Sequence, residues 1–578
     1  MASETNSTAK FIIAKNNGSF DAIKTHSNWR QSWFQIIPGS FVGGGYTDLL
    51  FYDRVHGEAK VYGSDGKGNI TLAKHHKAWA KSWDIIVPGK FLIGPNLTSL
   101  FLYDRSKGEA KFLFPDNNGG FKTVKNHTGW RKSWDIIVPF DTGGAWTGLL
   151  LYDRTHGEGK FFSNDGKGNL TLIKHYTNWK KNWDIIVPGN FGKNILTNDL
   201  LFYRRVVGEA KFFSTDVNGK MTRLAHHTNW SPDWDILLPL GSSSSTKLLC
   251  YNRADGLGVL SSIDSYNLKP IKSHKNWNKT WALIISGHFS ADTGHGLLFY
   301  RHGIQLKIRA IKCADDNGTR MAQISVDEVN EWIDAANKAY APAGVQFDHI
   351  TMVNTLKNTT INKLAPNDDE DSRQVKIDKQ KSKDAADAFA KDFPGEIVIF
   401  FRYGRNDEAA GGGFSSSKAD YVAMPGFSKT HTTAYYQDGS SKEIQNIKLL
   451  AHELGHYLGL DHTFVAVEYG ENSDAAVISY LNSVKSKTLD ALDGDRNVVR
   501  DTPPDVGKGY FLGKDWNPAD SSREIHIQSK ILRIDLTFNP DRHNVMSYFN
   551  CDDYYRLTKD QCRRIQEFLH GSKRKHLL

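Results

Sequence analysis

Short apolar segments and turn residues alternate through the first half of the chain, in a pattern that returns about every 50 residues. One unit contains an apolar segment that ends in a turn, as in 83–89, and a second segment such as 48–54. A third segment follows Gly57-Glu58, and a turn rich in Gly, Asp and Asn leads into a fourth. Four short strands between turns form one blade of a β-propeller. Tryptophan pairs four residues apart mark six copies: Trp29/Trp33, Trp79/Trp83, Trp130/Trp134, Trp179/Trp183, Trp230/Trp234 and Trp277/Trp281. The pattern predicts a six-bladed β-propeller over about residues 9–302.

The order of the segments at the two ends of this region predicts a closed ring. The chain begins at Ala9-Lys10-Phe11 in the middle of a unit, and 297–301 supplies the strand that should precede it. The last strand then completes a blade with the first and leaves no open sheet edge. The repeats resemble integrin-type (FG-GAP or VCBS-like) propeller repeats. The acidic calcium loop of some such repeats has no counterpart in 39–44, so we predict no regular calcium site in each blade.

The tryptophan pairs have two interpretations. Large aromatic side chains that recur in every unit usually pack between blades, and we favour this interpretation. The alternative is a lectin-like surface on which exposed indole rings stack on sugars. The later blades depart from the pattern at 251–253 and 263–264, which argues against six equal binding sites.

After Gly303 the pattern changes to that of mixed α and β structure. Residues 304–310 alternate as a strand does, and 396–401 form an apolar run typical of a buried strand. Ser325 and Glu328 form a capping box that opens a helix. Ser440 and Glu443 are interpreted as a second capping box, for a helix that runs to about Leu458.

Three further segments of the second half carry expectations. Residues 421–424 are a candidate edge strand that would hold an extended substrate. The charged stretch 367–391 is expected to be a solvated loop and helix. The basic end 573–575 is likewise expected to be a solvated terminus.

A metal-binding pattern follows within the helix predicted to begin at Ser440. It reads HELGHYLGLDH over residues 452–462. His452 and His456 lie one helical turn apart, so both imidazoles can reach one tetrahedral zinc ion. Gly459 lets the chain leave the helix and bring His462 round as a third ligand. The fourth position stays open for water, and Glu453 can take its proton and return it to a leaving amine.

The motif matches that of the metzincin metallopeptidases, HExxHxxGxxH. In metzincins a Met-turn lies beneath the metal, and 543–548 fits that turn, with Met546 as the apolar floor. Tyr548 resembles the tyrosine that astacins, serralysins and pappalysins place near zinc, where it would hydrogen-bond the oxyanion or act as a displaceable fifth ligand. Three flanking segments resemble the pappalysin family: 462–464, 493–503 and 544–548. The third of these segments is followed by Cys551 and by 557–561.

This resemblance implies further features of the second half. Pappalysin relatives can bind calcium near the active site, which makes Asp495 and Asp501 candidate Ca²⁺ ligands, although we favour a role in fixing their loop. Cys551 either pairs with Cys562 or both thiols stay free. Cys313 as a latency thiol is a weak alternative to a plain buried thiol.

Composition limits the remaining function classes. The chain has 578 residues, 73 basic and 64 acidic residues, a formal charge of +9 and four cysteines. This excess does not indicate a nucleic-acid partner, and the cysteines are too few for a disulfide scaffold. No apolar run is long enough for a transmembrane segment, and the first residues lack a signal peptide. We therefore expect a cytoplasmic store or non-classical export, and a monomer.

The sequence thus predicts a multidomain protein. Residues 1-302 are an all-β six-bladed propeller that serves as a recognition module, and 303-578 are an α+β metzincin-type (zincin) catalytic domain. The expected activity is that of a zinc-dependent metalloendopeptidase acting on a protein or peptide substrate through zinc-bound water and Glu453. The propeller would recruit a glycan or surface-protein ligand. The alternative is a lectin-like toxin or defence protein in which the peptidase is secondary.

Overall fold

The computed structural model describes most of the chain, which folds as two compact units, Met1–Gly303 and Ile304–Leu578. The described residues are 7–578 without 95, 155, 193–198, 206, 232–233, 242–245, 254, 292–294, 366–371, 404–413, 427–430, 436–440, 446–447, 464–498, 500–501, 503–524, 530–533, 539–542 and 548–554. Among the helices that this part of the chain forms, none combines the length and apolar character needed to cross a bilayer.

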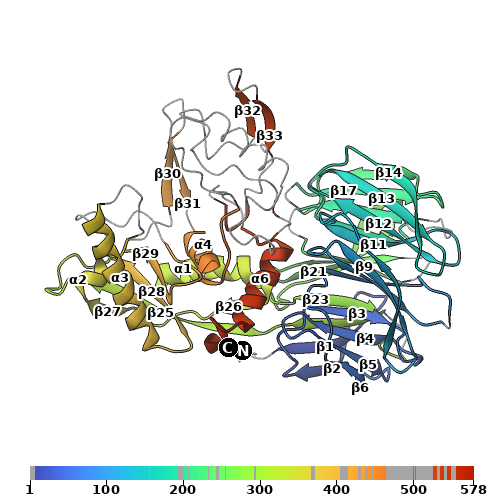
Figure 1. Cartoon of the computed structure of the whole chain (residues 1–578), viewed down its shortest axis with the longest axis horizontal. Coiled ribbons are helices and arrows are strands. Elements are labelled where there is room, and N and C mark those ends of the chain that lie inside the picture. The colour runs from blue at the N-terminus through green and yellow to red at the C-terminus, as the bar shows by residue number, and fades with distance from the viewer. Residues whose placement is uncertain are drawn as a thin grey trace. The chain divides into compact units, whose positions relative to one another are not determined.

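The first unit is a six-bladed β-propeller, as the sequence predicted (Figure 1). It consists of six four-stranded sheets in which every strand pair is antiparallel, and in five of them the four strands follow one another along the chain. Its strands are β1 (Thr8–Ala14), β2 (Phe20–Ser27), β3 (Gln35–Gly39), β4 (Asp48–Asp53), β5 (Glu58–Ser64), β6 (Ile70–His76), β7 (Ile85–Gly89), β8 (Ser99–Asp104), β9 (Glu109–Pro115), β10 (Phe121–His127), β11 (Ile136–Asp141), β12 (Thr147–Asp153), β13 (Glu158–Asn164), β14 (Leu170–Tyr176), β15 (Ile185–Gly189), β16 (Asp199–Arg204), β17 (Glu209–Thr215), β18 (Met221–His227), β19 (Ile236–Leu240), β20 (Lys247–Asn252), β21 (Leu257–Asp264), β22 (Asn267–His274), β23 (Leu283–Gly287) and β24 (His295–Arg301).

The propeller ring closes through the two strands that the sequence predicted to pair. The N-terminal strand β1 pairs with the last strand β24, from Thr8 opposite Arg301 to Ala14 opposite His295. The closing blade therefore has the order β2-β1-β24-β23 and combines strands from both ends of the repeat region. The edges that would otherwise face each other between the first and last strands are joined by backbone hydrogen bonds.

Hydrophobic patterning explains the position of each strand in a blade. The second strand is buried along its whole length, as in β4, where all six residues are buried. The third strand alternates, and the outermost strand is mainly exposed. The innermost strand tolerates proline, as at Pro38, because one side of an edge strand needs no ladder hydrogen bond.

The tryptophan pairs pack within the propeller, in agreement with the favoured interpretation. The second member of each pair is buried, with 4–9% of its surface exposed. The residue after the first member accepts a hydrogen bond from a fully buried tyrosine of the preceding blade: Tyr52 to Ala80, Tyr103 to Arg131, Tyr152 to Lys180, Tyr203 to Ser231, Tyr251 to Asn278 and Tyr300 to Arg30. Because the Tyr300 bond joins the sixth repeat to the first, this contact runs around the complete ring.

The second unit contains a parallel sheet with the order β26-β25-β28-β29, with β27 also paired to β25. Its elements are β25 (Ile304–Ala314), α1 (Val326–Tyr340), β26 (Val345–Phe347), β27 (Asn354–Lys357), α2 (Thr359–Asn362), α3 (Arg373–Lys391), β28 (Glu396–Arg402), β29 (Tyr421–Pro425), β30 (His431–Tyr435), β31 (Ser441–Gln445), α4 (Leu449–Tyr457), β32 (Ile525–Ser529), β33 (Ile534–Phe538) and α6 (Lys559–His570). One core cluster joins the sheet to α1, α4 and α6.

Of the two capping boxes predicted in this unit, one is confirmed and one is wrong. The Ser325–Glu328 capping box starts α1, and Thr558 with Gln561 forms the capping box of α6. The helix predicted from Ser440 does not begin there, because residues 441–445 form strand β31 and pair antiparallel with β30. Helix α4 begins at Leu449 instead. Strand pairing outweighs the local capping pattern at this position.

The basic terminus and the charged helix are more buried than predicted. Arg574 is fully buried, and its guanidinium stacks 3.7 Å from the centre of the Tyr457 ring while donating to the Tyr457 carbonyl. Arg574 and Lys573 both bond Asp420 at the start of the last sheet strand. Helix α3 is largely exposed, yet its Lys379 is 3% exposed. The prediction of a solvated terminus is therefore wrong for Arg574.

Candidate metal centre

Helix α4 and the turn that follows it carry the three histidines of the motif. His452 and His456 lie one turn apart on α4, which packs through Ala451, Leu454 and its C-cap Leu458 into the core of the unit. The chain leaves the helix at Gly459 with a φ of +87°, a left-handed conformation that other residues resist. A Cβ at this position would also lie 2.7 Å from the Phe568 ring.

The three imidazoles converge on one point. The Nε2 atom of His462 lies 3.1 Å from that of His456 and 3.2 Å from that of His452. Among the described residues, this is the one group of three His, Cys, Asp or Glu side chains close enough to hold a metal ion together. Tetrahedral zinc with Zn–N bonds of about 2.0–2.1 Å needs nitrogen–nitrogen distances of about 3.3–3.4 Å. The donor set and its spacing therefore fit zinc.

Backbone carbonyls fix the ring orientation of the two helical histidines. The Nδ1 of His452 bonds the Val545 carbonyl, and the Nδ1 of His456 bonds the Leu460 carbonyl, both at 2.8 Å. A carbonyl can only accept, so each Nδ1 carries the proton and each Nε2 presents its lone pair. Burial lowers the pKa of all three histidines, to about 3 for His462, and the other imidazoles add to this for His452 and His462. All three are thus neutral at pH 7, as metal ligands must be.

The Met546 turn lies directly against helix α4. Met546 is fully buried, and a Cβ added to Gly455 would meet its Sδ at 2.2 Å. The Met546 carbonyl accepts the Thr463 N–H at 3.1 Å, next to the third histidine. The side-chain amides of Asn544 and Gln561 on α6 donate hydrogen bonds to each other and hold the turn in place. The Met546 thioether therefore occupies the space that the missing side chain of Gly455 leaves open, at a position between His452 and His456 in the sequence.

Glu453 is almost completely buried, with 4% of its surface exposed. Its Oε2 has no hydrogen-bond partner among the described residues, although the Ser415 N–H bonds the carboxylate and lowers its pKa. Burial is the larger effect and raises the pKa of Glu453 to about 8, while the nearby Arg402 opposes that shift. With one oxygen unpartnered among the described residues and a raised pKa, this carboxyl group can exchange a proton near neutral pH.

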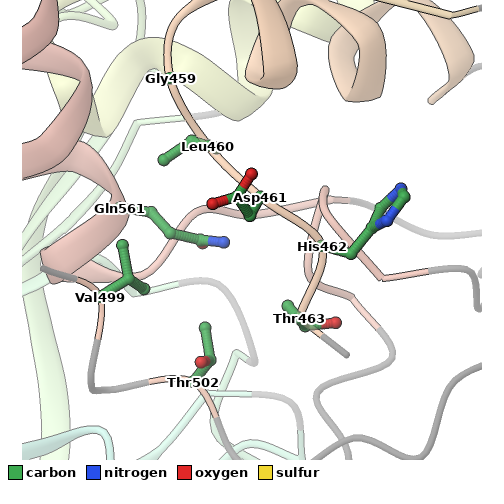
Figure 2. A pocket seen from close by; sticks show the side chains of 8 residues that line it. All are labelled: Gly459, Leu460, Asp461, His462, Thr463, Val499, Thr502 and Gln561. Atoms are coloured by element: carbon green, nitrogen blue, oxygen red, sulfur yellow. The ribbon is translucent and has the colours of Figure 1, made fainter. Parts of the chain in front are cut away.

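A small pocket lies behind the third histidine (Figure 2). Its volume of about 20 Å³ has room for one water molecule. Figure 2 shows Val499, Thr502 and Gln561 around it, with the His462 ring turned away from them. The pocket therefore brings the turn after α4 next to Gln561 of α6 and to Val499 and Thr502.

The predicted edge strand does lie at the edge of the parallel sheet, but part of its outer side is occupied. Residues 421–425 form β29, but the Ala423 N–H and carbonyl both bond Phe414 on the side away from β28. Beside Ala423 the outer position therefore belongs to the Phe414 segment. Cys313 is a fully buried thiol whose pKa burial raises to about 12, which disfavours a latency role.

Several predicted residues lie outside the described part of the chain. Tyr548, Asp495, Asp501 and Cys551 belong to this group, so their roles stay predictions. Sequence reasoning missed two residues that the structure brings to the centre, Lys448 and Arg402. Lys448 precedes His452 by one helical turn, and this spacing is a signal that could have pointed to it. Arg402 carries no such local signal, because it reaches Glu453 from the end of β28.

Comparisons with known proteins add little about the site. No family model matches the chain, and no curated protein matches it. Among solved structures, a protein from Bacteroides fragilis provisionally described as a 6-phosphogluconolactonase is 15% identical, with a TM-score of 0.33, over 47% of this chain and 78% of its own. One from Bacteroides uniformis with the same provisional description is 14% identical, with a TM-score of 0.33, over 48% and 81%. A protein from Lactobacillus plantarum is 13% identical, with a TM-score of 0.31, over 40% and 69%. Likenesses this distant say nothing about activity.

Proposed function

We propose that the second unit is a zinc-dependent metalloendopeptidase of the metzincin type, resembling the pappalysins. The observation that carries this proposal is the convergence of three imidazoles, with the Nε2 of His462 at 3.1 Å from that of His456 and 3.2 Å from that of His452. The carbonyls of Val545 and Leu460 support it, because they select the tautomer that can bind a metal. Bound zinc would supply Lewis-acid chemistry, which makes water a stronger acid and polarises a peptide carbonyl.

The side chains of the chain itself account for the proton transfers. Glu453 takes a proton from the attacking water and passes it to the amine of the leaving peptide. Its unpartnered Oε2 supports this role. Tyr548 is proposed, from the resemblance, to hydrogen-bond the developing oxyanion. Asp495 and Asp501 remain candidate calcium ligands, and the propeller is proposed to recruit the substrate or the surface on which it lies.

The test uses the full-length protein with a mixture of unfolded proteins or peptides as substrate. We expect one zinc per chain by metal analysis and cleavage that a chelator abolishes. Glu453→Gln removes the base while keeping the size of the side chain, so we expect zinc to stay bound and kcat to fall by about 10²–10⁴-fold. Unchanged cleavage by Glu453→Gln would show that the proposed mechanism is wrong. A Glu331→Gln variant, which makes the same change at an exposed position of α1, is the control for handling and should cleave as the unmodified chain does.

A further inference from the structure

A lysine is buried at the N-terminal end of helix α4. Lys448 is the N-cap residue of α4 and has 4% of its surface exposed. Its Nζ donates to the Ser547 carbonyl at 2.5 Å and lies 5.3 Å from the centre of the Tyr555 ring. Burying an ammonium group is unfavourable unless hydrogen bonds and opposite charges compensate for the lost hydration. The burial of this charge therefore calls for a structural explanation.

Three consecutive carbonyls of the Met546 turn bond parts of the metal centre. The Val545 carbonyl holds the His452 ring, and the Met546 carbonyl accepts the N–H of Thr463, which follows His462. The Ser547 carbonyl accepts the Lys448 ammonium. The first bond orients the His452 ring, and the second holds the chain next to His462. The third ties the same turn to the N-cap residue of the helix that carries His452.

We propose that Lys448 is a positioning residue of the metal centre. Its ammonium group holds the Met546 turn against the start of α4, and so fixes the distance between the helix and the carbonyls that orient His452 and the His462 segment. This inference rests on the proposed zinc site. Partners that orient metal ligands typically change metal affinity by about 10–100-fold when removed.

The sign of the effect separates positioning from charge. Lys448 is a cation near the imidazoles, and its charge lowers the pKa of both His452 and His462. If charge repulsion were its main effect on a bound dication, Lys448→Met would bind zinc more tightly. If Lys448 positions the turn, Lys448→Met binds zinc more weakly, and Lys448→Arg, which keeps charge and donor, restores the affinity.

The experiment measures zinc affinity by competition with a chromogenic chelator, on full-length protein stripped of metal. We expect Lys448→Met to bind zinc about tenfold more weakly and Lys448→Arg to lie within about threefold of the unmodified chain. Lys379→Met removes another buried lysine of the same unit, on α3, and should leave the affinity unchanged.

Two results would overturn the inference. One is equal or tighter zinc binding by Lys448→Met, and the other is an equal loss in Lys379→Met, which would indicate general loosening of the unit. If Lys448→Met does not yield folded protein, Lys448→Gln is measured in the same way and judged by the same outcomes. Absence of zinc binding by the unmodified chain would instead refute the proposed function.

Discussion

The contact between Gly455 and Met546 predicts that one added methyl group lowers both the stability of the metal-free protein and its affinity for zinc. In Gly455→Ala the new Cβ would meet the Met546 Sδ at 2.2 Å. Ordinary contacts of this kind lie at about 3.5–4.0 Å, so the thioether must retreat by about 1.5 Å. That movement shifts the turn whose Val545 carbonyl orients His452.

The magnitudes can be compared directly. Alanine stabilises a helix interior by about 1 kcal/mol relative to glycine, while overpacking a core costs about 1–3 kcal/mol. The free energy of unfolding of the metal-free protein should therefore fall by at most about 2 kcal/mol. Zinc affinity depends on ligand geometry and should fall about tenfold, which equals about 1.4 kcal/mol.

The assay combines chelator competition for zinc with thermal unfolding in the presence and absence of zinc. Met546→Ala creates the missing space, so the double variant Gly455→Ala/Met546→Ala should lose less affinity than the two single losses added together. Additive losses, or a Gly455→Ala variant that binds zinc as tightly as the unmodified chain, would refute the steric argument.

Two further predictions concern the propeller. Tyr152→Phe removes the hydroxyl that donates to the Lys180 carbonyl and accepts the Trp183 N–H. These backbone groups lose their partner, so the free energy of unfolding in urea should fall by about 1–3 kcal/mol. An unchanged unfolding midpoint would contradict a stabilising role for the tyrosine hydrogen bonds between blades. Burial raises the pKa of Asp199 from its usual value of 3.8 to about 6, so its contribution to stability is full below about pH 4 and is lost as the pH rises through 6. Asp199→Asn should accordingly raise Tm at pH 8 and leave it unchanged at pH 4, and the same shift at both pH values would count against this assignment.

The sequence alone determined the blade repeat and the cluster of three histidines, because both depend on local spacing. Tryptophans four residues apart recur with each set of four strands, and the phase of the two ends already implied the pairing of β1 with β24. The spacing of His452, His456, Gly459 and His462 likewise places three imidazoles together through helix geometry and one left-handed turn.

Only the tertiary structure decided the features that depend on distant partners. Pairing between β30 and β31 moved the start of α4 to Leu449, against the local capping pattern. Arg574 is buried because Tyr457 and Asp420 meet it from distant parts of the chain. Lys448 joins the metal centre through a carbonyl 99 residues away. Such contacts leave no periodic signal, since their energy comes from desolvation and pairing that exist only once the chain has folded.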